Sequence, residues 1–435
     1  MIVSRGYRLW NKAKKKIVGG NMLFSKRPDN FLPNSWPTYY SKAIGCYVWD
    51  LSNKKYVDIS LMGVGTNILG YANKEVDSSV IKNIKKSVSS TLNCPEEVEL
   101  AERLLEMNPW AKKVKFARTG GEANAIAIRI ARAFTRSTKV AICGYHGWHD
   151  WYLSTNLRSK NNLQNMLLKG LNTEGVPKEL ADTVHTFLYN KIDDLEKLLK
   201  EKKIKIIKME VMRNIYPEKD YLSKVRNLAN KYNALLIFDE CTSGFRETFG
   251  GLYKKYKVVP DMVIFGKALG NGYAITAIVG KDTVMEAGDN SFISSTFWTE
   301  RIGPTAALKT LHVMKKLKSW EYITQQGKKI KEEWKKISHR TGLEIKISGL
   351  DSNSSFIFND KLNNFYKTFI TSEMLKKGFL ASNSISLSMA HNDKIVNKYL
   401  KNLSLIFEKI AKLKIKKIKK IKGLKEARIG FYRLN

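Results

Sequence analysis

Two polar residues each close a short apolar run, and their types suit chemistry on a carbonyl-bearing cofactor. Asp239 ends the run at 234–239, Ala-Leu-Leu-Ile-Phe-Asp, and Lys267 follows Met-Val-Ile-Phe-Gly at 262–266. Short β-rich runs of this kind are typical of buried parallel strands, whose carboxyl ends bind ligands in open α/β sheets. At that edge an amine could form a Schiff base, and a carboxylate could hold a pyridine nitrogen protonated. Pyridoxal phosphate (PLP) needs both groups, so the pair predicts an enzyme with PLP as its first candidate cofactor.

A strand, a tight turn and a helix are predicted over 116–134, and the turn offers a phosphate site. Thr119, Gly120 and Gly121 stand at the expected start of the helix, before a run of Ala, Ile and Arg at helical spacing. Free N–H groups and the positive end of the helix dipole favour a phosphate there, and glycine permits close approach. An ordinary capped strand-to-helix turn would use the same residues, so both interpretations stay open.

The segment 143–152, Cys-Gly-Tyr-His-Gly-Trp-His-Asp-Trp-Tyr, directly follows another predicted strand. An aromatic ring beside glycines at a strand end can present a flat face to a planar ring, and Tyr145 is the candidate. His146 and His149 are three residues apart, which raises the possibility of a metal site. No cysteine, carboxylate or third histidine stands at zinc-motif spacing around them, so we predict no metal.

Two further segments complete the candidate chemistry. The glycines after Lys267 allow a tight turn that exposes its amine, and desolvation beside a cationic pyridinium would lower the pKa of that amine. The run Ser-Ser-Thr-Phe-Trp-Thr at 294–299 offers hydroxyl groups just before a predicted helix at 304–311, as a second possible phosphate contact.

Composition indicates a folded protein with a strongly basic surface. The 435 residues are 43% hydrophobic, and the net charge of +36 comes from 76 basic and 40 acidic side chains. The lysines are spread along the chain, which is typical of a solvated surface, so we predict no nucleic-acid partner. The densest basic run, 412–422, has isoleucines at every third position and suits a helix stripe. No apolar run is long enough to span a membrane, no secretory signal is recognisable, and four scattered cysteines favour a cytoplasmic location.

The chain is expected to form an α/β fold with three zones. Residues 1–65 would contribute a hairpin, from 45–50 and 53–58, to a small lobe; residues 66–315 would form the large cofactor-binding domain; residues 316–435 would form a C-terminal small domain with the basic tail. Alternating strands and helices in the second zone predict a mostly parallel sheet with helices on both faces, beside a smaller α+β lobe. Its predicted strands are 113–117, 139–143, 204–210, 234–239, 262–265 and 274–279, and the third zone adds 343–347 and 354–358.

The order of these pieces resembles the class III aminotransferases, PLP enzymes of fold type I, and most closely their glutamate-1-semialdehyde aminomutase branch. The resemblance runs from about Lys26 to the C-terminal helices, and its most specific parts are 119–123, 145–147, 239–246 and the turn at Lys267. It implies that Lys267 forms the Schiff base and then moves a proton between substrate and cofactor. It also implies that Asp239 pairs with the pyridine nitrogen and that Tyr145 stacks on the ring.

The resemblance assigns the remaining cofactor contacts as well. Thr119, Gly120 and Gly121 would bind the phosphate, and His146 and Glu210 would belong to the cofactor site. Thr296 matches the position that reaches the phosphate from a neighbouring subunit. That role requires a homodimer with active sites at the subunit boundary.

The chain departs from the family pattern at several positions. Gly121 stands where a Ser or Thr is usual, so one hydroxyl contact is missing, and the smaller Cys241 replaces a Val or Ile that packs on the ring face. The run 298–304 replaces the usual glycine-asparagine-proline sequence on the substrate side. No arginine lies between residues 27 and 103, the stretch from which aminomutases partly hold their substrate carboxylate.

We therefore expect a PLP-dependent aminotransferase that moves an amino group from a donor to a carbonyl acceptor, through a Lys267 Schiff base and a pyridoxamine form. The sequence does not identify the donor or the acceptor. A first alternative is glutamate-1-semialdehyde 2,1-aminomutase, which would turn over one substrate without a separate donor. A second is a basic polyanion-binding protein on an inactive enzyme scaffold, which would bind polyanions in a salt-dependent way and take up no cofactor.

Overall fold

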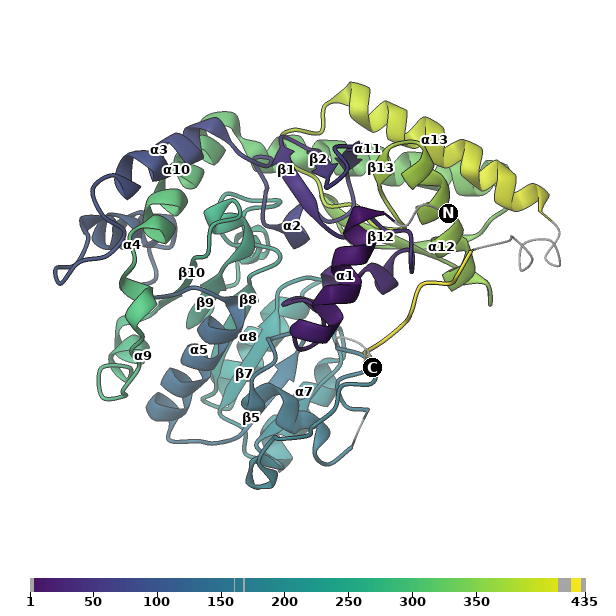
Figure 1. Cartoon of the computed structure of the whole chain (residues 1–435). Helices are drawn as coiled ribbons and strands as arrows, with labels where there is room; N and C mark the ends of the chain where they lie inside the picture. The colour runs from purple at the N-terminus through teal and green to yellow at the C-terminus, as the bar shows by residue number, and fades with distance from the viewer. Residues whose placement is uncertain (1–3, 160, 167–168, 414–423, 432–435) are drawn as a thin grey trace. The chain divides into compact units, whose positions relative to one another are not determined.

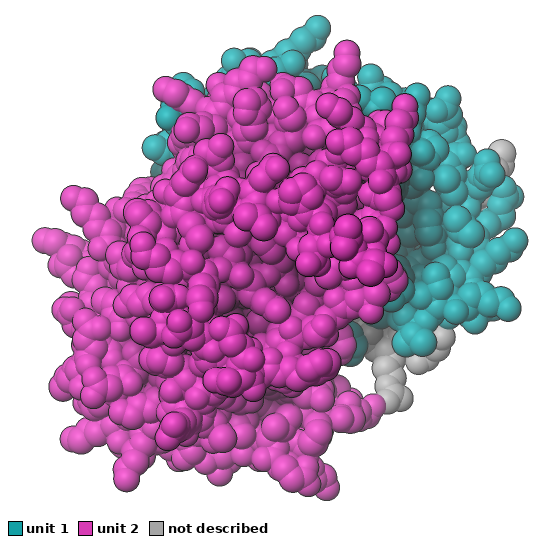
Figure 2. Space-filling view, turned by 90° about the vertical axis from the view of Figure 1, so that its left-hand side faces the viewer, with its two compact units in different colours: residues 1–73, 321–435 teal, residues 74–320 magenta. Residues whose placement is uncertain are grey.

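The computed structural model describes residues 4–159, 161–166, 169–413 and 424–431 (Figure 1). The chain divides into two compact units, coloured separately in Figure 2. Unit 1 comprises residues 1–73 and 321–435, and unit 2 comprises residues 74–320. All of the residues singled out above for cofactor chemistry belong to unit 2.

Unit 2 is built on a seven-stranded sheet in the order β4-β10-β9-β8-β7-β5-β6. Strands β9, β8, β7, β5 and β6 pair in parallel, whereas β10 pairs antiparallel with both β4 and β9. Every residue of β5, β7, β8, β9 and β10 is buried, as expected for strands covered on both faces. The strand bounds are β4 Lys113–Ala117, β5 Val140–Cys143, β6 Val184–Thr186, β7 Ile206–Glu210, β8 Leu235–Glu240, β9 Met262–Phe265 and β10 Thr276–Gly280.

Helix α5, Gly120–Thr135, is the helix that matters most for the site. Thr119 is its N-cap, and a capping box joins the Thr119 hydroxyl to the amide of Glu122 and the Glu122 carboxylate to the amide of Thr119. Its buried Ala and Ile residues pack along β4, β10, β9, β8 and β7. The other α-helices of unit 2 are α3 Lys74–Ile84, α4 Pro95–Met107, α6 Asp150–Leu153, α7 Ile192–Glu201, α8 Tyr221–Lys231, α9 Asp282–Glu286 and α10 Ile302–Leu317.

Unit 1 has a four-stranded sheet in the order β1-β2-β3-β13 and a separate hairpin of β11 and β12. Trp334, Phe356 and Phe407 form an aromatic core, with ring centroids 4.8 Å and 5.7 Å apart along that series. Its strands are β1 Tyr40–Ile44, β2 Tyr47–Asp50, β3 Lys55–Asp58, β11 Ile345–Leu350, β12 Asn353–Phe358 and β13 Phe379–Leu380; its α-helices are α1 Arg5–Lys16, α2 Met62–Gly65, α11 Ser319–Thr341, α12 Asn363–Lys376 and α13 Asp393–Lys412.

The predicted strands of the parallel sheet are confirmed, two of them with the observed bounds and the rest with overlapping ranges. The hairpin predicted from 45–50 and 53–58 is the antiparallel pair β2–β3. Three short strands, β1, β6 and β13, were not predicted. The helix stripe predicted for 412–422 lies almost wholly outside the described residues, since α13 ends at Lys412. None of the helices in the described parts of the chain is long and apolar enough to cross a bilayer.

Candidate active site

Lys267 lies just past the end of β9, where the backbone turns sharply. Its φ of 38° is in the left-handed region, which is strained for a residue with a side chain. The amine Nζ donates to Thr242 Oγ1 at 2.9 Å. Burial, and then the charge of Arg213, lower the pKa of Lys267. Lys267 therefore presents an amine whose protonated form is disfavoured, at the sheet edge where ligands bind.

Asp239 lies near the end of β8 and is held from two sides. Its Oδ2 is 2.8 Å from His146 Nδ1, and its Oδ1 accepts from the amide of Cys241 at 3.0 Å. Burial opposes ionisation, but the charge of Lys208 and the hydrogen bond from His146 together keep the pKa of Asp239 below its ordinary value. Burial also lowers the pKa of His146, so the neutral imidazole donates to an ionised carboxylate.

Lys208, which was not predicted, lies on the same face of the sheet as Asp239. It is fully buried on β7, and its Nζ is 4.0 Å from Asp239 Oδ2 without a hydrogen-bond partner in the described structure. Burial lowers the pKa of Lys208. The available signal was its position two residues before Glu210, which places both side chains on one face of a strand.

Glu210 ends β7 and connects three of the site residues. Its Oε2 accepts from the amide of Tyr145 at 2.9 Å and lies 3.3 Å from Arg213 Nη1. Gly144 makes this approach possible, because a Cβ there would come within 2.5 Å of Glu210 Oε2. The Arg213 guanidinium lies over the Tyr145 ring, 5.3 Å from its centroid. Arg213 was also missed, although it follows Glu210 by only three residues.

The first turn of α5 carries the predicted phosphate contacts. The first two amides of an α-helix have no partner within the helix, and no other acceptor meets Gly120 N or Gly121 N in the described structure. Gly120 also lies close to Cys241, since a Cβ on Gly120 would be 3.4 Å from the Cys241 sulfur. The free amides of Gly120 and Gly121 therefore lie near Cys241, which follows Asp239 and Glu240 in the sequence.

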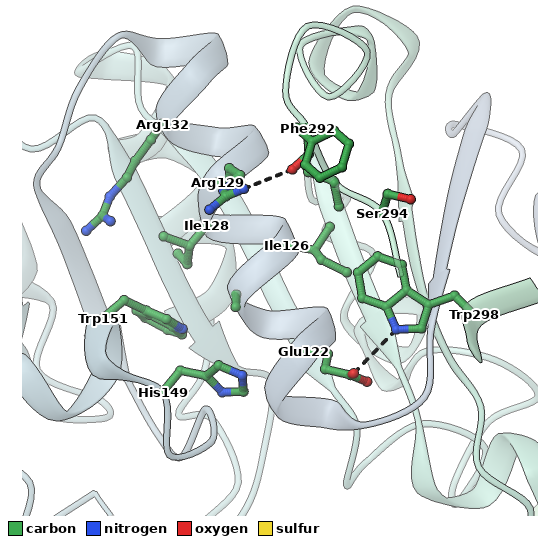
Figure 3. A pocket seen from close by; sticks show the side chains of 12 residues that line it. Glu122, Ile126, Ile128, Arg129, Arg132, His149, Trp151, Phe292, Ser294 and Trp298 are labelled. Carbon is green, nitrogen blue, oxygen red and sulfur yellow. Dashed lines mark hydrogen bonds between the residues drawn. The ribbon is translucent and has the colours of Figure 1, made fainter. Parts of the chain in front are cut away.

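Thr296 lies apart from the predicted residues at the strand ends. It is exposed in the 3₁₀ turn Thr296–Thr299, and no hydrogen bond of the described structure joins it to the other predicted residues. Its neighbour Trp298 donates from Nε1 to Glu122 Oε1 at 3.3 Å, which ties the segment to the first turn of α5. Figure 3 shows both residues in a pocket of about 450 Å³ that is also lined by His149, Arg129 and Phe292.

His146 and His149 have different neighbours. His146 is committed to Asp239, whereas the His149 ring stacks on Trp148 with centroids 4.5 Å apart. Over the part of the chain that the structure describes, no three His, Cys, Asp or Glu side chains gather as a metal site.

Comparison with known proteins places the chain in a family. A family model described as aminotransferase class-III matches residues 32–383. The chain is 34% identical to 3-aminobutyryl-CoA aminotransferase of Cloacimonas acidaminovorans over 80% of its own length and 82% of that protein. It is 30% identical to glutamate-1-semialdehyde 2,1-aminomutase of Sulfurisphaera tokodaii over 89% of its own length and 96% of that protein.

Solved structures agree on the fold. The FumI protein of Sphingopyxis sp. MTA144 superposes with a TM-score of 0.84 at 23% identity, covering 94% of this chain and 98% of that one. An omega-transaminase from Sphaerobacter thermophilus gives 0.82 at 20% identity, covering 94% and 98%. The fold is thus that of the type I PLP-dependent transferases. The chain belongs to the class III aminotransferase family, the PLP-dependent enzymes that move an amino group from a donor to a carbonyl acceptor.

Proposed function

We propose that Lys267 binds the PLP carbonyl carbon and that Asp239 pairs with the pyridine nitrogen. The observation that carries this proposal is the state of the two groups at one sheet edge: burial disfavours the charge on the Lys267 amine, whereas the Asp239 carboxylate stays ionised. A neutral amine is the nucleophile that a carbonyl requires, and an ionised carboxylate stabilises a protonated ring. These residues fit the cofactor that the family uses.

The other proposed cofactor contacts lie near the carboxyl ends of the same strands. Gly120 N and Gly121 N, which lack a protein acceptor in the described structure, would hold the phosphate at the positive end of α5. Thr119 would fix that turn through the capping box, and Tyr145 would cover one face of the ring. His146 and Glu210 would act through other residues, His146 by orienting Asp239 and Glu210 by holding the amide of Tyr145.

Bound PLP would supply an electron sink that stabilises negative charge on the substrate carbon. The chain's own work is then proton transfer and positioning. Lys267 Nζ, once released from the cofactor, is the base that takes the proton from the substrate carbon and later returns one. Thr242 Oγ1, 2.9 Å away, holds the amine in place between these steps.

The test compares the wild-type protein with Lys267→Ala and Lys267→Arg after incubation with PLP. We expect visible absorbance from lysine-linked cofactor in the wild type only, borohydride labelling of the peptide that contains residue 267, and loss of that absorbance on adding an amino donor. The donor panel includes α-amino acids and, because one relative is named for 3-aminobutyryl-CoA, β-amino acids. Wild-type protein that takes up no cofactor, yet binds polyanions in a salt-dependent way, would instead support the binding-protein alternative.

A second candidate is glutamate-1-semialdehyde 2,1-aminomutase, because the chain is 30% identical to a protein of that name over 89% of its length. The two activities differ in their need for a donor. An aminomutase would move the amino group of glutamate-1-semialdehyde from carbon 2 to carbon 1, with the enzyme in its pyridoxamine phosphate form and no added amine. A requirement for a separate donor in every turnover would favour the aminotransferase.

We further propose that the enzyme works as a homodimer with Thr296 reaching the phosphate of the partner's site. Exposed aromatic side chains near the pocket of Figure 3 support this arrangement: Phe292, which lines the pocket, Phe297, which precedes its lining residue Trp298, and Trp148, which stacks on its lining residue His149, are 88%, 76% and 69% exposed in the single chain, and large exposed apolar side chains in one region mark an interface. Light scattering should give twice the mass of one chain. Phe292→Asp with Phe297→Asp should yield monomers with weaker PLP binding, whereas monomeric wild-type protein would contradict the proposal.

We propose a cytoplasmic location, since all four cysteines are free thiols and two of them, Cys46 and Cys143, are buried. Fractionation of the source cells, followed by detection with an antibody, tests this location directly.

A further inference from the structure

Lys208 is the buried ionisable group that the proposed cofactor contacts leave unused. It lies on β7, two residues before Glu210, and is fully buried; its Nζ meets no hydrogen-bond acceptor in the described structure. Burying an amine without an acceptor costs free energy, because the lost hydration is not replaced. Such groups are rare in native proteins, and each calls for an explanation. The charges around Lys208 supply one.

Four ionisable side chains lie close enough to interact with the charge of Lys208: Asp239, Cys241, Glu210 and His146. Burial raises the pKa of the Cys241 thiol and lowers the pKa of His146, so both are neutral at neutral pH. Glu210 is already paired with Arg213, whose Nη1 lies 3.3 Å from its Oε2. Asp239 is therefore the counter-charge of Lys208, and the Lys208 Nζ lies 4.0 Å from the Asp239 Oδ2.

The Asp239 carboxylate can accept a further donor. Its Oδ2 meets His146 Nδ1 at 2.8 Å, and its Oδ1 accepts from the amide of Cys241 at 3.0 Å. A carboxylate offers about four lone-pair sites, so the N–H of a protonated pyridine can join these two donors. The negative charge of Asp239 attracts that N–H, whereas a cation 4.0 Å from the same carboxylate cancels part of the attraction. The charge of Lys208 thus opposes that of Asp239 at a ring nitrogen bound there.

We propose that the charge of Lys208 weakens the hold of Asp239 on the pyridine proton, and that Lys208 thereby sets how readily the cofactor ring is protonated. This inference rests on the proposed pairing of Asp239 with the pyridine nitrogen. A protonated ring is the stronger electron sink. Lys208 therefore limits the electron withdrawal that Asp239 promotes, and it does so through its charge alone, without binding substrate or transferring a proton.

The test loads the wild type, Lys208→Met, Lys208→Gln and Lys208→Arg with PLP that carries ¹⁵N at the pyridine nitrogen. NMR spectra at several pH values follow the ¹⁵N chemical shift, which differs between a protonated and a free ring nitrogen. We expect the midpoint of this change to lie about one pH unit higher in Lys208→Met than in the wild type, which is a tenfold stronger hold on the ring proton. Lys208→Gln, which is also uncharged, should show a similar increase.

Two further variants separate the charge of Lys208 from its packing. Lys208→Arg keeps a positive charge, so its midpoint should stay near that of the wild type. Lys205→Met is the matched control, because it removes the lysine that directly precedes β7, whose Nζ donates to the backbone oxygen of Tyr232 at 2.6 Å. Its midpoint should equal that of the wild type.

Two results would overturn the proposal: ring nitrogens that titrate alike in the wild type and the uncharged variants, or a Lys208→Arg midpoint that moves as far as that of Lys208→Met. Lys208→Gln keeps the test valid if Lys208→Met does not fold. PLP uptake is read separately from the visible spectrum. Wild-type protein that takes up PLP, but whose ring nitrogen titrates as it does in Lys208→Met, refutes only this inference, and protein that takes up no PLP refutes the proposed function.

Discussion

We predict that Gly121→Ala destabilises the protein when the neighbouring His149 ring is present and stabilises it when that ring is removed. A Cβ built on Gly121 would lie 2.7 Å from His149 Cε1 and 2.9 Å from His149 Nδ1, closer than real Cβ contacts. The His149 ring is stacked on Trp148 with an angle of 27° between the rings, so turning aside would break this stacking. His149 thus occupies the space into which the Ser or Thr usual in the family would extend.

The expected energies follow from two opposing effects. Replacing a helical glycine by alanine stabilises a helix by roughly 0.5–1 kcal/mol when the site has room. Overpacking against a fixed side chain costs about 1–3 kcal/mol. We therefore expect Gly121→Ala to lower the free energy of unfolding by about 1–2 kcal/mol in the wild type. In a His149→Ala background the same change should raise it by roughly 0.5 kcal/mol.

Urea denaturation of cofactor-free wild type, both single variants and the double variant forms a complete double-mutant cycle. The coupling free energy should be about 1–3 kcal/mol, and Gly121→Ala should change sign between the two backgrounds. An equal loss of stability with and without the His149 ring would refute the contact. So would a Gly121→Ala variant that is more stable than the wild type while His149 is present.

Three further changes have defined outcomes for the cofactor-free protein. Burial lowers the pKa of Lys208, so the folded state releases the Lys208 proton at a lower pH than the unfolded state does. The stability of the wild type relative to Lys208→Met should therefore rise with pH above neutrality, by up to about 1.4 kcal/mol per pH unit. Urea denaturation at several pH values measures this difference. Burial raises the pKa of Glu240 from 4.5 to about 7. The stability of the wild type relative to Glu240→Gln should therefore fall by about 3 kcal/mol between pH 4.5 and 7 and stay level above pH 7. A stability difference that does not change with pH would contradict this. Thr119→Ala removes the N-cap of α5 and should cost about 1 kcal/mol in thermal unfolding, whereas Thr119→Ser should cost little.

The parallel strands and α5 were predictable because short sequence segments carry the signals for strand burial and for helix capping. The run 234–239 becomes β8, all six of whose residues are buried, because a continuous apolar segment suits a strand covered on both faces. Thr119 and Glu122 form a capping box that the three-residue spacing already indicates. The strand β6 was missed because its three residues, 184–186, are too few to show a period.

The charged neighbours of the site depend on strand order, which local patterns do not reveal. Lys208 comes close to Asp239 because β7 pairs in parallel with β8, with Glu210 opposite Asp239. Nothing in the sequence says that these two strands are adjacent, so neither Lys208 nor Arg213 could be connected to Asp239 or Tyr145 from the sequence. The ring of His149 beside Gly121 likewise depends on how the loop after β5 folds back on α5.

Burial, together with the charges around the carboxyl ends of β7 and β8, explains why the Lys267 amine favours its neutral form. Each nearby carboxylate already has a cation: Asp239 has Lys208 at 4.0 Å, and Glu210 has Arg213 at 3.3 Å. The hydrogen-bond acceptor of Lys267 is instead the neutral hydroxyl of Thr242. Burial of the ammonium and the positive charge of Arg213 lower the pKa of Lys267, and they outweigh the opposing charge of Glu210. Arg213, which the sequence did not identify, therefore favours the neutral amine that the proposed role of Lys267 requires, because its charge repels the ammonium and it pairs with Glu210.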